Sequence, residues 1–413
     1  MKINQLITRA FSNKSYASLV AHKLIHAFDF FGIDYRLFAG YSFPPKSVCL
    51  ILTDKCNLKC SMCDIGQANA HNKNAAYQSP LLASIQSGEY QMSTEEWLNI
   101  LDDLARFVPK PLILLTGAEP FLYPEIMWVI EKIISKGFSL HITTNGTLLA
   151  KYASDLVTLC RTARNMDITV SLDDIGESHD NIRGVKGTFQ RAIDGIQQII
   201  SAREIRHQAF PIINITCTIS NLNYKNLVSF TEWFIHENVP VESITFNHLW
   251  FKDATLVKNH NKQFGHTAPA QETNVRGIDI REIDMNAVHV QVSQIKKRCA
   301  ETHMRIHQEP DLSYDEGLVY YTDPSRFVFS KRCTAPWRNV SITPTGSIIL
   351  SPLCFLPAID TIKEKTFSAI WNGASFRKIR QQLKAVKAYP ACTRCCMLFS
   401  SRPKYYKMKS WLR

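Results

Sequence analysis

Between residues 47 and 250, short apolar runs alternate with longer segments of helical periodicity, and this alternation constrains the fold more than any other feature. Repeated strand-helix units predict parallel strands joined by right-handed crossovers, which curl into a barrel or an open part-barrel. Such folds place their chemistry at the carboxyl ends of the strands. We therefore predict an α/β fold with a partial (β/α)6 barrel. The six expected strands are 47–53, 111–116, 139–144, 166–172, 212–219 and 243–249.

Helices are expected between these strands at 94–107, 124–136, 188–202 and 224–236, the first with Ser93 as its N-cap. Two stretches interrupt the alternation. Residues 65–92 are long for a connection without secondary structure, which suggests a lid or a substrate loop. Residues 251–330 form a connecting region with a helix-like stretch at 285–307, and a small cysteine-rich domain is expected to follow at 331–400.

The length of the chain and its cysteine content indicate the cellular compartment in which the protein works. The chain has 413 residues, 45% apolar content and 12 cysteines, so it can bury a sizeable core without disulfides. We expect a helical N-terminal extension at 1–46 that begins as an amphipathic helix and carries no signal peptide. No later run approaches the roughly 18 apolar residues that a membrane span needs. The sequence therefore predicts a cytoplasmic protein whose reduced thiols are free to bind metal.

The formal net charge of +12 is compatible with nucleic acid, an anionic membrane or an acidic substrate as partner. Part of this charge lies in a basic, aromatic tail at 401–413. A solvated tail is the simplest interpretation, and contact with an anionic membrane surface or another acidic partner is the alternative. Charge alone does not choose between them.

Cys56, Cys60 and Cys63 form a C-x3-C-x2-C loop directly after the first expected strand. Three thiolates can bind three irons of a 4Fe-4S cluster and leave the fourth iron open to an exchangeable ligand, whereas an electron carrier normally closes that position with another cysteine. A zinc site usually needs a fourth Cys or His at short range. The spacing therefore predicts a 4Fe-4S cluster with one open iron.

A second cysteine set follows residue 330 and consists of Cys333, Cys354, Cys392 and Cys395. A Thr-Gly step at 345–346 between two apolar runs predicts a hairpin between the first two of these cysteines. Four thiolates would ligate a second 4Fe-4S cluster fully, with Cys396 either substituting for a neighbour or staying free. Zinc is the alternative, although the first two cysteines are not spaced as a zinc-ribbon pair.

With these loops in place, the sequence resembles the radical S-adenosylmethionine (SAM) superfamily over 47–250 and the SPASM and twitch extensions of that family after 331. The Leu-Thr-Gly-Ala-Glu-Pro run at 115–120 resembles the family's Gly-Gly-Glu-Pro motif, with Ala118 in place of the second glycine. The resemblance implies that backbone at Gly117 and the Glu119 carboxylate bind the amino group of SAM. Ala118 fits the same turn provided that its φ is negative.

Other strand ends extend the resemblance. Asn145, in a Thr-Asn-Gly turn, follows the third strand, and Ser171 and Asp173 close the fourth. Hydroxyl, amide and carboxylate groups at these strand ends suit a ribose and an amino acid carboxylate. The resemblance implies that Arg183 is the cation for the SAM carboxylate. Asn221, after the fifth strand, is a candidate for contact with adenine.

The resemblance implies an enzyme that receives an electron from a flavodoxin- or ferredoxin-type reductant and cleaves SAM to a 5′-deoxyadenosyl radical. This radical would abstract a hydrogen atom from a peptide or small-molecule substrate, with the auxiliary 4Fe-4S cluster assisting electron transfer. A radical SAM enzyme that modifies RNA is an alternative, but nucleic acid is disfavoured because the C-terminal segment resembles a cluster domain. A non-enzymatic electron carrier does not explain the residues at the strand ends.

Overall fold

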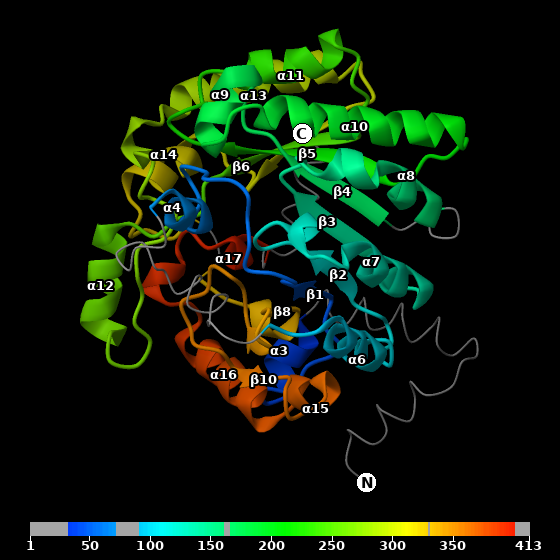
Figure 1. Cartoon of the computed structure of the whole chain (residues 1–413). Coiled ribbons are helices and arrows are strands. Elements are labelled where there is room, and N and C mark those ends of the chain that lie inside the picture. The colour runs from blue at the N-terminus through cyan, green and yellow to red at the C-terminus, as the bar shows by residue number, and fades with distance from the viewer. Residues whose placement is uncertain (1–31, 72–90, 161–165, 329–330, 401–413) are drawn as a thin grey trace.

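Six parallel strands form the centre of the molecule, as the sequence predicts. The computed structural model describes residues 32–71, 91–160, 166–328 and 331–400 (Figure 1). Each central strand pairs in parallel with the next one along the chain, and the resulting sheet is curved. These strands are β1 (Ser47–Leu50), β2 (Leu112–Leu115), β3 (Leu140–Thr144), β4 (Met166–Ser171), β5 (Ile212–Ile219) and β6 (Ser243–His248).

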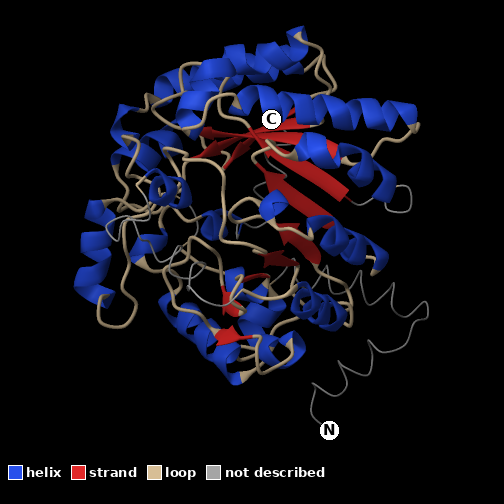
Figure 2. Cartoon of the chain, in the orientation of Figure 1, coloured by secondary structure: helices blue, strands red, loops and turns tan. Residues whose placement is uncertain are grey.

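The sheet continues beyond both edges of this part-barrel. At one edge β7 (Arg305–Glu309) pairs in parallel with β6, and at the other β8 (Asn339–Ile342) pairs in parallel with β1. The expected hairpin is β8 with β9 (Ser347–Ile349), followed by the short β10 (Asp360–Thr361). Within the described residues one sheet therefore has the order β10-β9-β8-β1-β2-β3-β4-β5-β6-β7. Figure 2 shows the strands in red, with helices around them. The C-terminal cysteine region is thus joined to the strand that leads into the first cysteine loop.

Helices pack along the central sheet between successive strands (Figure 1). The Ser93 hydroxyl accepts a hydrogen bond from the backbone N–H of Glu96 and caps the first of these helices, as predicted. They are α6 (Thr94–Leu104), α7 (Ile126–Ser135), α8 (Leu149–Leu159), α9 (Gly176–Arg183), α10 (Thr188–Ile205) and α11 (Leu227–His236). No helix in the described ranges has both the length and the apolar character needed to cross a membrane.

The remaining helices lie in the N-terminal segment, the connecting region and the C-terminal region. They are α3 (Ile33–Leu37), α4 (Asp64–Ala70), α12 (Ala254–Phe264), α13 (Met285–Cys299), α14 (Tyr314–Thr322), α15 (Phe367–Trp371), α16 (Ala374–Val386) and α17 (Cys396–Ser400). Short 3-10 turns occur at η2 (Pro120–Leu122), η3 (Ile280–Glu282), η4 (Ala335–Trp337) and η5 (Pro390–Cys392).

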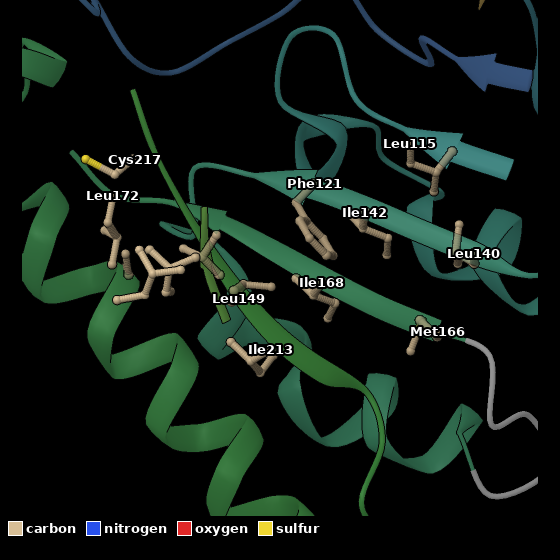
Figure 3. Close-up of a cluster of buried hydrophobic side chains, with 14 of the residues drawn as sticks. Leu115, Phe121, Leu140, Ile142, Leu149, Met166, Ile168, Leu172, Ile213 and Cys217 are labelled. Atoms are coloured by element: carbon tan, nitrogen blue, oxygen red, sulfur yellow. The ribbon is translucent and has the colours of Figure 1, made fainter. Parts of the chain in front are cut away.

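The core of the part-barrel follows from the alternation of side chains along the strands. In β4 every second residue is buried, including Met166 and Ile168, and in β3 Leu140 and Ile142 are buried in the same way. Figure 3 shows these side chains beside Leu149 of α8. Burying a side chain of this size contributes about 1.5–3 kcal/mol. This packing holds the carboxyl ends of neighbouring strands in a fixed relation.

Two expectations about the elements are wrong. The helix-like stretch 285–307 ends at Cys299, and the residues from Arg305 form β7 because they pair with β6, which no local pattern reveals. The predicted loop 65–92 begins instead as α4, whose residues are mostly buried against neighbouring segments. The rest of that loop from 72 to 90, the predicted N-terminal amphipathic helix and the basic tail lie outside the described residues.

Arg380 of α16 ties the N-terminal segment to the C-terminal region. Its guanidinium is buried and donates to the backbone carbonyls of Pro336 at 2.7 Å and Gly40 at 3.0 Å, and to the Asn372 side chain at 2.9 Å. It also lies over the Trp371 ring, 4.4 Å from the centroid. Burial lowers the pKa of Arg380 to about 9, and these acceptors and the ring compensate the buried charge.

Replacing Arg380 by Ala should lower the free energy of unfolding by about 3 kcal/mol, because several buried acceptors lose a charged donor together. Urea denaturation of the anaerobic protein, followed by circular dichroism, measures the change. Lys378→Ala on the exposed side of the same helix is the matched control and should change stability by less than about 0.5 kcal/mol. Equal effects of the two substitutions would contradict an anchoring role for Arg380.

Candidate functional site

The first cysteine loop leaves the carboxyl end of β1 and is held against the end of α9. Two backbone N–H groups on either side of Cys60 donate to carbonyls there at 3.0 and 2.9 Å. Burial raises the pKa of the Cys56 thiol to about 12 and of Cys63 to about 11, and other thiols of the set add to both rises. Three thiols so close together ionise jointly only with cations among them, and cluster irons are such cations.

Two glycines bring other segments into contact with this loop. A Cβ atom at Gly66 of α4 would lie 2.4 Å from the backbone nitrogen of Cys60. One at Gly277 would lie 2.4 Å from the carbonyl oxygen of Ser61. The Gln67 side chain also donates to the Cys60 carbonyl, at 3.2 Å. The loop is therefore enclosed by α4 and by the connecting region, for which the sequence offered no role.

The Glu119 carboxylate is buried where β2 leads into η2. It accepts hydrogen bonds from the Thr144 hydroxyl and the Asn145 backbone N–H, both at 2.8 Å, and from the Phe121 backbone N–H at 3.1 Å. Burial raises the pKa of Glu119, and these three donors oppose the rise. An ionised carboxylate has about four acceptor sites, so one remains for an ammonium group.

The turn before Glu119 has the backbone conformation that an alanine at position 118 requires. Gly117 has a φ of 122°, and a Cβ there would lie 2.7 Å from the Ile51 side chain, so glycine suits this position. Ala118 is not among the described non-glycine residues with a positive φ, so alanine is accommodated. The Glu119 backbone N–H donates to the Lys55 carbonyl at 2.9 Å, which ties this turn to the first cysteine loop.

Asn145 links the turn after β3 to the same loop. Its side-chain amide donates to the Asn57 side chain at 2.8 Å, and its side-chain oxygen accepts from the Thr147 hydroxyl at 2.7 Å. Asn57 in turn donates to the Thr147 hydroxyl at 2.9 Å. Asn145 is thus engaged with the residue next to Cys56. The sequence analysis did not single out Asn57, although its place inside the cysteine loop was a signal.

Arg183 joins Asp173 to the cysteine loop. Its Nε lies 2.7 Å from Asp173 Oδ2, and its Nη1 lies 3.8 Å from Cys60 Sγ. The two charged side chains are 11% and 0% exposed. At this separation the opposite charges of the two buried groups attract each other directly. Burial raises the pKa of Asp173, and Arg183 opposes the rise. A buried cation therefore lies beside the first thiol set.

Ser171 and Asn221 lie at the ends of β4 and β5. Ser171 is half-buried and pairs with Thr216 in the ladder. The Asn221 amide donates to the Glu282 carboxylate at 2.8 Å, and its oxygen accepts from the Asp279 backbone N–H at 3.3 Å. The structure thus turns Asn221 toward η3 and does not bring it into the hydrogen-bonded group around Glu119 and the first cysteine loop.

Asn223, which the sequence analysis missed, is fully buried two residues further on. Its amide donates to the Asp173 carbonyl at 2.7 Å and to the Thr218 carbonyl at 2.9 Å. Thr218 also donates its backbone N–H to the Asp173 carboxylate at 2.9 Å. Asn223 therefore fixes the segment that carries Asp173. Nothing in the local sequence separates it from Asn221.

The second cysteine set gathers from three segments. Cys333 precedes η4, Cys354 follows β9, and Cys392 and Cys395 lie at and after η5. Burial is the main cause that raises the pKa of Cys333, and the charges of Cys395 and Cys354 add to the rise. Burial also raises the pKa of Cys392, and the charges of the other three thiols add to that rise. Four mutually interacting, half-buried thiols fit a fully ligated cluster.

Cys396 stands apart from this set. Its thiol hydrogen-bonds with Cys395 and with the Ser351 side chain, and the charge of Cys395 adds to the burial that raises the pKa of Cys396. The hydrogen bond from Cys396 is the main cause that lowers the pKa of Cys395 to about 6. The two adjacent thiols therefore interact directly, and Cys395 stays the predicted fourth ligand of the set.

Arg394, inside the final C-x2-C, is a further buried residue that sequence reasoning missed. Its guanidinium donates to the carbonyls of Val319 at 2.9 Å, Tyr320 at 2.7 Å and Asp323 at 2.8 Å. These carbonyls lie at the C-terminal end of α14, where unpaired acceptors and the helix dipole favour a cation. The connecting region therefore shapes the loop that carries Cys395.

No three His, Cys, Asp or Glu side chains within the described ranges converge on a point that one metal ion could occupy. A 4Fe-4S cluster does not require such convergence, because each thiolate binds a different iron. The donor chemistry of both cysteine sets is that of iron-sulfur sites.

Family models match both parts of the chain. Residues 50–225 match the radical SAM superfamily, and residues 333–396 match SPASM, an iron-sulfur cluster-binding domain. The chain is 26% identical to an AdoMet-dependent heme synthase of Methanosarcina barkeri over 81% of its own length and 85% of that protein. It is 25% identical to the sporulation killing factor maturation protein SkfB of Bacillus subtilis, over 44% of this chain and 38% of SkfB.

Solved structures agree in fold. Streptococcus suis SuiB bound to its precursor peptide SuiA aligns with a TM-score of 0.55 at 13% identity, covering 93% of this chain and 77% of SuiB. SuiB bound to S-adenosylmethionine aligns with the same TM-score at 16% identity, covering 90% and 76%. With both cysteine sets placed by the fold and both domains matched, this chain belongs to the radical SAM superfamily and carries a SPASM iron-sulfur cluster-binding domain.

Proposed function

We propose that this enzyme reductively cleaves SAM to a 5′-deoxyadenosyl radical and abstracts a hydrogen atom from a peptide or small-molecule substrate. The observation that supports this best is the contact of Arg183 with both Asp173 and the Cys60 thiol. An electron carrier has no need of a buried ion pair from two other elements beside its cluster loop.

The charges around this loop complement the methionine part of SAM, which carries an ammonium and a carboxylate. Glu119, oriented by three donors, is the proposed acceptor for the ammonium group. Arg183 is the proposed partner of the carboxylate, with Asp173 fixing its position. Asn145 is assigned a positioning role, because its amide holds Asn57 in the loop.

When bound to Cys56, Cys60 and Cys63, the open-iron cluster supplies the electron that breaks a carbon-sulfur bond of SAM. The surrounding residues exclude water from this chemistry, since Glu119 and Asp173 are each 1% exposed and Cys60 is 6% exposed. A flavodoxin- or ferredoxin-type protein is the proposed reductant. Cys333, Cys354, Cys392 and Cys395 are the proposed ligands of an auxiliary 4Fe-4S cluster that assists electron transfer.

The relatives differ in the molecules that their names mention. One is a heme synthase, whereas SkfB is a maturation protein and SuiB binds a precursor peptide. The shared part of these proteins is the radical SAM fold, so the proposal commits to SAM cleavage and hydrogen abstraction. Assays for 5′-deoxyadenosine with candidate precursor peptides and with tetrapyrroles distinguish the two substrate classes.

Anaerobically purified protein should contain about eight irons per chain, because two separate thiolate sets are available. Metal analysis together with electron paramagnetic resonance (EPR) of the reduced protein measures this. Iron near four per chain, with stoichiometric zinc that resists iron chelation, would exclude the auxiliary cluster and leave the first cluster in place.

The two cysteine sets should differ in function. Replacing Cys56, Cys60 and Cys63 together by Ala should abolish 5′-deoxyadenosine formation in dithionite-reduced protein. Replacing Cys333, Cys354, Cys392 and Cys395 by Ala should preserve some SAM cleavage but stop substrate turnover. The second variant must first prove monodisperse, because metal binding can supply folding free energy of the order of 10 kcal/mol. SAM cleavage by the first variant would contradict the assignment of the open-iron site.

Glu119→Gln should weaken SAM binding about tenfold or more at unchanged iron content. The substitution removes the carboxylate charge and sets an amide donor among three existing donors. Equilibrium binding of SAM to the cluster-loaded protein measures the effect. Glu131→Gln on the exposed side of α7 is the control and should bind SAM as the unmodified chain does. Undiminished SAM affinity of Glu119→Gln would rule out the proposed ammonium contact.

A further inference from the structure

Lys252, just beyond β6, is a buried ammonium beside the second cysteine set. The residue is 6% exposed, and its Nζ donates to the carbonyl of Leu353 at 2.9 Å. Leu353 immediately precedes Cys354 in the chain. Lys252 and Cys395 also line the same small cavity, together with Leu353 and Arg394. The ammonium therefore lies close to two of the proposed ligands.

This ammonium has no carboxylate partner among the described residues, where its charged group bonds only to the Leu353 carbonyl. Asp253, the adjacent residue, uses its carboxylate to cap α12 by accepting from the Leu256 backbone N–H at 2.8 Å. A buried charge without a counterion is costly. Four thiolates bound to a cluster would provide the missing negative charge.

The first cysteine set has a different charge balance. Its nearby cation, Arg183, is paired with the buried Asp173, so the two fixed charges largely cancel. Arg394, another buried cation near the second set, directs its guanidinium to the backbone carbonyls at the end of α14. Lys252 is the cation directed toward the loop that carries Cys354.

We propose that the fixed positive charge of Lys252 raises the reduction potential of the auxiliary cluster. Reduction adds one negative charge to a cluster, and a cation beside it in a poorly solvated site stabilises the reduced form. Hydrogen bonds, net charge and solvent exposure are known determinants of such potentials. The inference rests on the proposed auxiliary cluster and deepens its role in electron transfer.

The test is a redox titration, followed by EPR, of the cluster-loaded full chain with and without SAM. The signal that SAM leaves unchanged belongs to the auxiliary cluster. In Lys252→Met the one-electron reduction equilibrium constant of this cluster should fall tenfold or more, which corresponds to about 59 mV. Lys252→Arg retains the charge and should stay within twofold of the unmodified protein.

Lys258→Met removes an exposed lysine from the nearby α12 and is the matched control, with an expected change below twofold because solvent screens its charge. The potential of the SAM-sensitive cluster should not change in any variant. An unshifted potential in Lys252→Met, or an equal shift in Lys252→Arg, would overturn the proposal.

Lys252→Gln covers the case in which Lys252→Met loses the cluster, because glutamine retains a donor for the Leu353 carbonyl without the charge. A lowered potential in this variant supports the proposal, and an unchanged potential overturns it. Loss of the cluster from both neutral variants but not from Lys252→Arg also supports a requirement for charge. Loss from Lys252→Arg as well would overturn it.

Unmodified protein without a SAM-insensitive cluster would instead refute the proposed auxiliary cluster, and the role of Lys252 with it.

Discussion

The parallel pairing of β8 with β1 determines where the two cysteine sets lie relative to each other. Ser47 to Leu50 pair residue by residue with Asn339 to Ile342, and the Ser47 hydroxyl donates to the Asn339 side chain at 2.8 Å. One of these strands leads into the first cysteine loop, and the other begins the hairpin that leads to Cys354. Because Cys56 follows β1 by six residues and Cys333 precedes β8 by six, the ladder fixes how the first cysteine loop lies relative to the start of the second set.

Burial of charge is the second constraint. Cys60 is buried and the other thiols of both sets are half-buried, and this burial opposes the ionisation of every one of them. At Cys395 a hydrogen bond from the Cys396 thiol outweighs that effect and lowers the pKa. Buried cations therefore accompany each set, Arg183 at the first and Lys252 at the second. The difference between them is the carboxylate of Asp173, which compensates only the first. The same fold thus surrounds its two thiol sets with different net fixed charge.

The sequence predicts the features that depend on local pattern. Strands, their order and the C-x3-C-x2-C loop follow from periodicity and spacing, and Glu119 and Arg183 follow from motifs next to strand ends. Contacts between distant segments were not predictable in this way. The pairing of β7 with β6, the bond from Asn223 to Asp173 and the approach of Lys252 to Leu353 each join residues whose own neighbourhoods carry no signal. Asn221 shows the opposite case. Its place after a strand suggested a role in the site, but its side chain bonds to Glu282 of η3.

The connecting region, the part of the chain that the sequence explained least, contacts both thiol sets. Gly277 approaches the carbonyl of Ser61 so closely that a side chain would not fit. Lys252 donates a hydrogen bond to the carbonyl of Leu353, just before Cys354. The carbonyls at the end of α14 accept hydrogen bonds from Arg394. A backbone bridge between Lys252 and Thr273 connects these contacts within the region. The segment that encloses the first cysteine loop is therefore continuous with the one that places a charge beside the second. Residues of this one region thus contact both cysteine loops, although they are far from both in the sequence.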